Sequence, residues 1–356
     1  MTEPGPTETD PLPRLDAARL SAGTRGSLPG TDMPESLRML RGELGDPHQG
    51  ALPVLPETGW AGTRLARTVA TLGGLSADLQ AAGWRLRESP GREARTAAAR
   101  LSSDVQALAD AIGAESAGHR GTTVVDLIGP LSLAAELHLG EGRAVLADHG
   151  ARRDLREAQR AGLAEYVRAL RTAVEGEDLV LRVRELRAEQ VLAGRVPTAS
   201  GLRTLRAVPR GEARAALSEL ALAARSLGLG TILDQGGPIP DPDLRAEFDA
   251  VAVRPASTDP RDWEAAAAAH DTGLGLRLGV LTGPDTRGRL PDPGREAAAL
   301  WRTWRSLGLG QEHLRGIALE ERADLDPVAP ERVASLLGVG ARTAQILAEL
   351  AAEDAA

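Results

Sequence analysis

Thr122–Ile128 (TTVVDLI) and Leu179–Arg184 (LVLRVR) are two short apolar runs rich in β-branched residues, and a longer stretch separates them. In that stretch, the apolar residues of Arg152–Val174 recur every three or four positions, as on one face of an amphipathic helix. A second stretch of this kind, Gly211–Leu227, leads to a third short run at Thr231–Asp234. Strands that alternate with helices in this way predict an α/β protein with a parallel sheet.

The same alternation continues on both sides of this region, and we expect eight short runs to form strands. They are Leu20–Ser27, Trp84–Arg87, Thr122–Ile128, Leu179–Arg184, Thr231–Asp234, Ala250–Arg254, Leu274–Leu281 and Gly316–Glu320. Eight strands separated by helices fit a single-domain (β/α)₈ barrel, whose usual size is about 250 residues before insertions. An open, doubly wound sheet is the alternative, because a count of strands alone does not distinguish the two folds.

The first residues of the chain differ in composition from the rest. Residues 1–18 carry prolines among acids and threonines, at Pro4, Pro6, Pro11 and Pro13. This composition predicts a solvated tail rather than part of a core. The barrel is then expected to occupy residues 19–356.

The overall composition limits the classes of partner. The chain of 356 residues has 42% hydrophobic residues, contains no lysine or asparagine, and has a formal net charge of −8. All 42 basic residues are therefore arginine, a bias that fits a G/C-rich genome and is no sign of nucleic-acid binding. No apolar run is long enough to cross a bilayer, and the acidic N-terminus does not resemble a secretory leader. We therefore expect a cytoplasmic protein without membrane or nucleic-acid partners.

Four segments carry a resemblance to a known family. They are Gly26–Gly30 (GSLPG), Asp78–Leu86 (DLQAAGWRL), Leu146–Leu155 (LADHGARRDL) and Val191–Gly201 (VLAGRVPTASG). In this order they resemble the short, single-barrel homologues of cobalamin-independent methionine synthase that are typical of actinobacteria. The resemblance implies the barrel fold shared with uroporphyrinogen decarboxylase, and methyl transfer from a folate to the thiol of homocysteine. It also implies a zinc ion held through cysteine thiolates.

The resemblance assigns substrate contacts to three residues. Gly26 and Ser27 match the segment that holds the carboxylate of homocysteine, and glycines around a serine do allow close approach of backbone amides to an anion. A tight turn after the first strand would need the same residues. Glu185 matches a glutamate at the end of the family's fourth strand.

At other positions, the family's functional residues are replaced. Asp126 replaces a glutamine, and Arg184 replaces the aspartate that holds the substrate ammonium group. Asp234 and Gly236 replace a histidine and a cysteine that bind zinc, and Ala323 replaces the cysteine that provides the last zinc thiolate. Arg254 replaces an acidic residue. An arginine at position 184 would repel an ammonium group and attract an anion. A zinc site that activates a thiol needs three protein ligands, and on this alignment only Asp234 remains.

These replacements predict a barrel without its original chemistry. We expect no zinc and no other cofactor, and a small anionic ligand bound by the amides around Ser27 together with Arg184 and Arg254. The alternative is a methyltransferase that activates its acceptor without zinc. A further analogy, based on fold alone, is uroporphyrinogen decarboxylase, which binds its substrate through arginines and an aspartate. A comparable set of side chains in this chain would be Arg25, Arg184, Arg254 and Asp234.

The C-terminal run Leu336–Leu347 (LLGVGARTAQIL) allows two interpretations. The Gly338–Gly340 segment resembles the hairpin of a helix-hairpin-helix motif, whose amides approach a DNA phosphate. The other interpretation is a last barrel helix that begins near Pro330 and is kinked by its glycines. We expect the helix, because the chain is acidic and has no second copy of the motif.

Overall fold

The computed structural model describes residues 19–81, 83–115, 121–237, 239–256, 259–285 and 287–355. Eight strands form one parallel sheet in the order β1-β10-β9-β8-β7-β6-β5-β2. Their bounds are β1 Ser21–Ala22, β2 Gln49–Ala51, β5 Thr122–Ile128, β6 Asp178–Arg184, β7 Gly230–Asp234, β8 Ala250–Val253, β9 Gly275–Leu281 and β10 Ile317–Glu321. β1 and β2, at the two edges, meet just beyond their ends, where Val54 N donates to Gly26 O (2.8 Å) and Leu28 N donates to Val54 O (3.1 Å). The sheet thus closes into a (β/α)₈ barrel, as the sequence predicts, and is not an open sheet.

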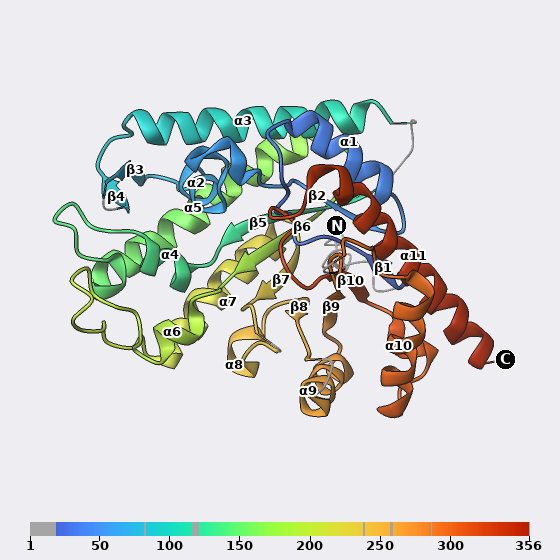
Figure 1. The fold of residues 1–356 in the computed structure, drawn as a ribbon. Helices are drawn as coiled ribbons and strands as arrows, with labels where there is room; N and C mark the ends of the chain where they lie inside the picture. Colours follow the sequence, from blue (N-terminus) through green and yellow to red (C-terminus); the bar gives the residue numbers. More distant parts are fainter. Residues whose placement is uncertain are drawn as a thin grey trace, which may run out of the picture.

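Helices surround the barrel strands (Figure 1). Their bounds are α1 Met33–Glu43, α2 Arg64–Ala70, α3 Arg92–Gly113, α4 Pro130–Glu136, α5 His149–Ala173, α6 Ala188–Leu192, α7 Arg210–Ser226, α8 Pro242–Arg245, α9 Pro260–Asp271, α10 Pro293–Ser306 and α11 Pro330–Asp354. Aspartates begin several of them: the side chain of Asp148 accepts from Ala151 N at the start of α5, and Asp292 accepts from Arg295 N at the start of α10. Such caps satisfy amides that have no partner within the helix. None of the described helices combines the length and the apolar character needed to span a bilayer.

The core has two parts. The larger part fills the space between the strands and the surrounding helices. The smaller part lies inside the barrel and consists of Ala51, Val124, Val180, Ile232, Ala250 and Ala252. Because successive side chains on a strand point to opposite faces, residues two positions further along the same strands also point inward. After Val124, Ile232 and Ala252 these residues are Asp126, Asp234 and Arg254, which belong to the site described below.

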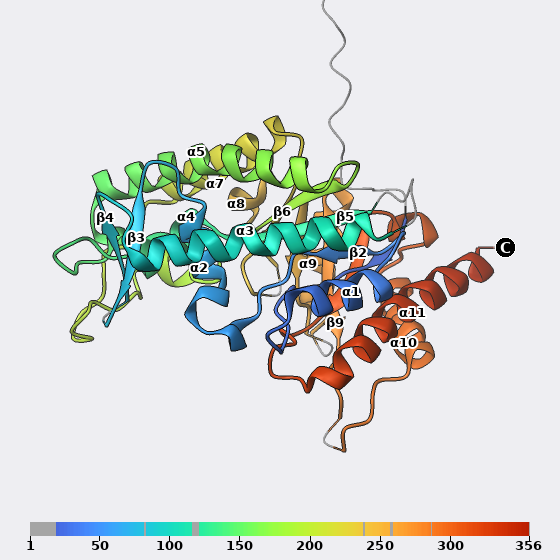
Figure 2. The ribbon, with the colours of Figure 1, turned by 90° about the horizontal axis from the view of Figure 1, so that it is seen from above.

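One of the eight expected strands is wrong. Trp84–Arg87 lies in β4 (Gly83–Arg87), which pairs antiparallel with β3 (Ser76–Gln80) in a separate hairpin. This hairpin lies beside one end of α3, away from the barrel strands (Figures 1 and 2). Trp84 is buried there, with its ring 5.6 Å from that of Trp60. The second barrel strand is instead β2, only three residues long, whose sequence QGA has no apolar run to reveal it.

The C-terminal glycines belong to a helix and not to a hairpin. The Gly338–Gly340 segment lies inside α11, which runs without a break from Pro330 to Asp354. A Cβ atom on Gly340 would lie 2.9 Å from Cδ1 of Leu281, and one on Gly338 would lie 2.7 Å from Oε2 of Glu43. The glycines therefore let α11 pack closely against β9 and α1. The helix-hairpin-helix interpretation is incorrect.

A glycine in α5 gives a direct test of this packing. A Cβ atom on Gly162 would lie 1.6 Å from Thr71 O and 2.6 Å from Gly73 N, in the loop after α2. Gly162→Ala is therefore expected to destabilise the protein by about 1–3 kcal/mol or more, as forced overpacking does. Gly42→Ala, in α1 with open space around it, should instead stabilise by about 0.4–1 kcal/mol. Urea denaturation measures both, and equal stabilities of the two variants would contradict the close contact.

Candidate functional site at the carboxyl mouth of the barrel

The carboxyl ends of the strands bring charged side chains to one place. Asp126 on β5, Arg184 on β6 and Asp234 on β7 each stand an even number of residues after an inward apolar residue of the same strand. The register pairs Arg184 with Asp234 on the neighbouring strand. Arg254 follows β8 in the same way, two residues after Ala252. The period of two along each strand thus directs these four side chains into the barrel.

Arg184 lies at the centre of the group and is 1% exposed. Its Nε and Nη2 donate to Oδ2 of Asp126 at 3.0 and 2.7 Å, and its Nη1 donates to Oδ2 of Asp234 at 2.7 Å. Its Nη2 also donates to the carbonyl oxygen of Arg25. Both edges of the planar guanidinium group therefore donate hydrogen bonds, as in the strongest charge-assisted pairs.

Asp234 is the carboxylate that most of the arginines share. Besides Arg184, it accepts from Nη2 of Arg254, which lies 2.9 Å from both carboxylate oxygens. Nη1 of Arg25 lies 3.6 Å from Oδ2, and Gly236 N donates to Oδ1 at 2.9 Å. Asp234 itself is fully buried. The set Arg25, Arg184, Arg254 and Asp234 therefore does converge.

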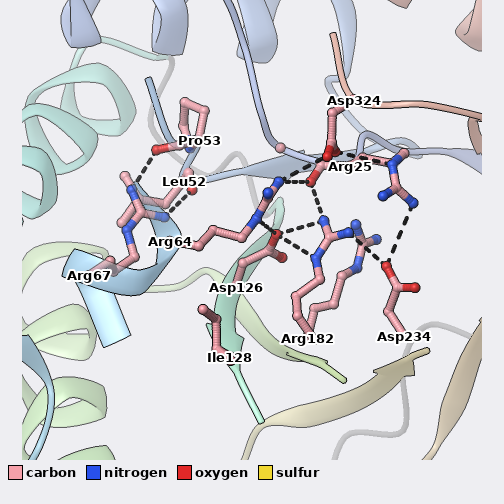
Figure 3. Close-up of polar contacts among 12 residues, drawn as sticks. Arg25, Leu52, Pro53, Arg64, Arg67, Asp126, Ile128, Arg182, Asp234 and Asp324 are labelled. Atoms are coloured by element: carbon pink, nitrogen blue, oxygen red, sulfur yellow. Dashed lines mark hydrogen bonds and ion pairs between the residues drawn. The ribbon is translucent and has the colours of Figure 1, made fainter. Parts of the chain in front are cut away.

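Two further residues complete the group, and neither was expected from the sequence. Arg64, on α2, donates to Asp126 Oδ2 (3.0 Å) and to Arg25 O (3.0 Å). Asp324, in the loop after β10, accepts from Arg25 Nε at 3.1 Å and lies 3.5 Å from Arg64 Nη2. Figure 3 shows Arg25, Arg64, Asp126, Asp234 and Asp324 pointing toward one another. We call the set of Arg25, Arg64, Asp126, Arg184, Asp234, Arg254 and Asp324 the mouth network.

The charges in the mouth network shift one another's pKa. Burial alone raises the pKa of Asp126, but the guanidinium groups of Arg184, Arg182 and Arg64 outweigh it and hold that pKa well below its usual range. Burial lowers the pKa of Arg184, whereas Asp126 and Asp234 raise it above its ordinary value by a larger amount. Opposite charges at this distance favour the charged form of both partners. Both groups are therefore ionised across the physiological range.

The residues assigned to substrate by resemblance lie in different places. Gly26, with φ +75°, has its amide hydrogen bonded to Thr24 Oγ1, and a Cβ atom on it would lie 3.8 Å from Asp126 Oδ2. Ser27 is buried beside it, and its backbone pairs with that of Val54 in an isolated parallel β-bridge. This segment therefore borders the mouth network and also closes the barrel.

Glu185 is directed away from the mouth network. Its Oε1 accepts from Leu131 N (2.8 Å), and its Oε2 accepts from Ser132 N (2.8 Å) and Ser132 Oγ (2.7 Å). It thus binds the first turn of α4. Burial raises its pKa to about 7 even though these hydrogen bonds lower it. Gly129 makes room for it, since a Cβ atom there would lie 2.4 Å from Oε1.

The positions that match zinc ligands do not assemble a donor set. Gly236 contributes only its amide, and Ala323 is exposed in the loop after β10. Among the residues that the structure describes, no group of three histidine, cysteine, aspartate or glutamate side chains could hold a metal ion. The chain also contains no cysteine. The residues present therefore do not fit a zinc ion of the thiolate type.

Comparisons with known proteins agree with the fold. No family model matches the sequence, and no curated protein matches it. A B12-independent methionine synthase from Shewanella sp. W3-18-1, in complex with selenomethionine, has a similar structure: the TM-score is 0.54 at 11% identity, over 94% of this chain and 98% of that one. A putative fructose-1,6-biphosphate aldolase from Coccidioides immitis (TM-score 0.37, 12% identity, 95% and 89% covered) and an oxaloacetate acetylhydrolase in complex with oxalate (0.34, 12%, 93% and 93%) are also similar. At this identity, the first likeness shows the barrel fold that it shares with this chain.

Proposed function

We propose that this chain is a methionine synthase-like barrel that does not carry out zinc-dependent methyl transfer and instead binds a small anion at the carboxyl mouth. The four sequence segments and the similar fold support the methionine synthase-like origin. The donor set for zinc is missing at the aligned positions. Arg184 also stands where the resemblance places the aspartate that holds the substrate ammonium group, and a guanidinium repels an ammonium group.

One observation carries the anion proposal. Nη1 of Arg254 is buried and has no hydrogen-bond partner among the described residues. The mouth network also has four guanidinium groups but three carboxylates, so one positive charge is not balanced within it. A buried donor without a partner costs about 1–3 kcal/mol. A carboxylate or phosphate oxygen bound to Arg254 would satisfy the donor and balance the charge.

Titration calorimetry of the purified full-length protein with oxalate and with inorganic phosphate tests this proposal. We expect at least one of the two to bind, and Arg254→Met to weaken binding by about tenfold, the effect of losing one charge-assisted hydrogen bond. Arg302→Met, an exposed arginine on α10, is the matched control and should bind as the wild type does. Unchanged affinity in Arg254→Met would reject the mouth as the anion site.

A separate experiment tests the loss of zinc chemistry. Protein from zinc-supplemented cells, analysed by elemental mass spectrometry with and without homocysteine, should contain far less than one zinc per chain. A methionine auxotroph that carries only this gene should fail to grow without methionine. One tightly held zinc per chain, or growth of the auxotroph, would contradict this proposal and support methyl transfer as the function.

A further inference from the structure

A second site lies at the opposite end of the barrel. A cavity of about 970 Å³ opens among the amino-terminal residues of the strands, including Ser21 of β1, Gln49 of β2, Gly275 of β9 and Ile317 of β10. This volume is at the upper end of the range of small-molecule sites, about 300–1,000 Å³. We call it the amino-end cavity. It shares no lining residue with the mouth network.

Arginines dominate the charge of this cavity. Arg225, Arg245, Arg277 and Arg315 line it, and Asp249 is the single carboxylate among the described lining residues. Oδ2 of Asp249 already accepts from Thr231 N (2.9 Å) and Thr231 Oγ1 (2.8 Å), and its Oδ1 lies 3.7 Å from Arg225 Nε. The cavity therefore has an excess of positive charge that its own residues do not balance.

Arg277 is the deepest of these cations. It lies on β9, points into the barrel and is only 2% exposed, yet its Nε and Nη2 have no hydrogen-bond partner in the described part of the chain. Glu320, the acid whose charge acts on Arg277, is bound by Arg182 through its Oε1. The pKa of Arg277 is lowered to about 10, chiefly by burial, while Glu320 raises it and Arg182 lowers it. Unpaired donors on a buried guanidinium are rare, because a buried polar group normally has a partner.

We propose that the amino-end cavity binds a small organic polyanion, with a phosphate or carboxylate group held by Arg277. Arg225 and Arg245, both half-buried, and Arg315, which is exposed, then bind the other charges nearer the opening. Four guanidinium groups around one cavity suit a ligand with several negative oxygens, because each group presents a fork of donors. Nucleotides and polycarboxylates share this chemistry. The site is separate from the proposed function at the carboxyl mouth.

Titration calorimetry with ATP and with citrate, on the full-length protein, tests this inference. We expect one of the two to bind at one site per chain, more weakly as salt is raised. Arg277→Met should weaken that binding by at least about tenfold, as the loss of a charge-assisted hydrogen bond does. Tighter binding of ATP would identify phosphate as the preferred group, and tighter binding of citrate would identify carboxylate.

Three further variants distinguish binding in the amino-end cavity from binding elsewhere on the protein. Arg315→Met changes an exposed side chain, so it should weaken binding without a change in melting temperature, even if Arg277→Met affects folding. Arg302→Met, on the surface, should bind as the wild type does, and any loss in Arg254→Met, at the carboxyl mouth, should be smaller than the loss in Arg277→Met. The inference is overturned if neither compound binds, if Arg315→Met and Arg277→Met bind like the wild type, or if only Arg254→Met loses binding.

Discussion

Replacing Asp234 by alanine is expected to destabilise the protein by about 3–5 kcal/mol, the usual cost of removing one partner from a buried ion-pair network. Asp234 is fully buried and lies within 3.6 Å of the guanidinium groups of Arg184, Arg254 and Arg25. Alanine would leave these three cations without their shared anion, in a place that solvent barely reaches. Urea denaturation near neutral pH measures the loss.

Two controls make this result specific. Asp271→Ala changes an exposed acid at the last residue of α9, and it should alter stability by no more than about 0.5 kcal/mol. The double variant Asp234→Ala with Arg254→Met removes one cation together with the anion, so it should be more stable than Asp234→Ala alone. A loss below about 1 kcal/mol in Asp234→Ala would show that water or a moved side chain replaces the carboxylate.

The strands that could be predicted from the sequence are those buried on both faces. β5 and β6 consist mostly of apolar residues because helices cover one face and the barrel interior covers the other. β2 has no such signature: three residues, one of them a glycine, extend between Pro47 and Pro53, and their pairing with β5 holds them in the sheet. The run that begins at Trp84, by contrast, does form a strand, but that strand belongs to the β3–β4 hairpin and not to the barrel. Local composition therefore cannot decide which short strand joins the barrel.

The mouth network was predictable where it depends on strand periodicity. Asp126, Arg184 and Asp234 lie on adjacent strands, so inward alternation alone brings them together. The same rule explains Glu185, which follows Arg184 directly and therefore points the other way, toward α4. Arg64 and Asp324 come from a helix and a loop, whose positions depend on tertiary packing. No pattern in the sequence marks them.

The stability of the protein is also expected to fall as the pH rises from about 5 to about 7, because two buried glutamates have raised pKa values. Burial raises the pKa of Glu185 and of Glu321 from 4.5 to about 7. Glu185 binds the amides of α4, and Glu321 accepts from Arg25 N at 3.0 Å. Between the two pKa values, the folded state holds protons that the unfolded chain has released. Each group therefore stabilises the fold fully below its unfolded pKa and loses that contribution as pH rises through its folded pKa, at most about 3 kcal/mol per carboxyl.

Asp126 has the opposite dependence, because its pKa is lowered in the folded protein. Its contribution is present above its ordinary pKa of 3.8 and is lost as pH falls further. We therefore expect the greatest stability between about pH 4 and pH 5, measured as the urea midpoint across the range from about pH 3 to pH 8.

Glu321→Gln identifies the group responsible for the loss above pH 5. The neutral amide keeps an oxygen that can accept from Arg25 N and cannot ionise. In this variant, the decrease in stability between pH 5 and pH 7 should therefore be about half of the decrease in the wild type, since the contributions of separate sites add. Glu35→Gln, on the exposed face of α1, should leave the decrease unchanged. If the wild type instead became more stable between pH 5 and pH 7, the pKa values of both buried carboxyls could not be raised. Such a result would require more water or positive charge around them than the described residues provide.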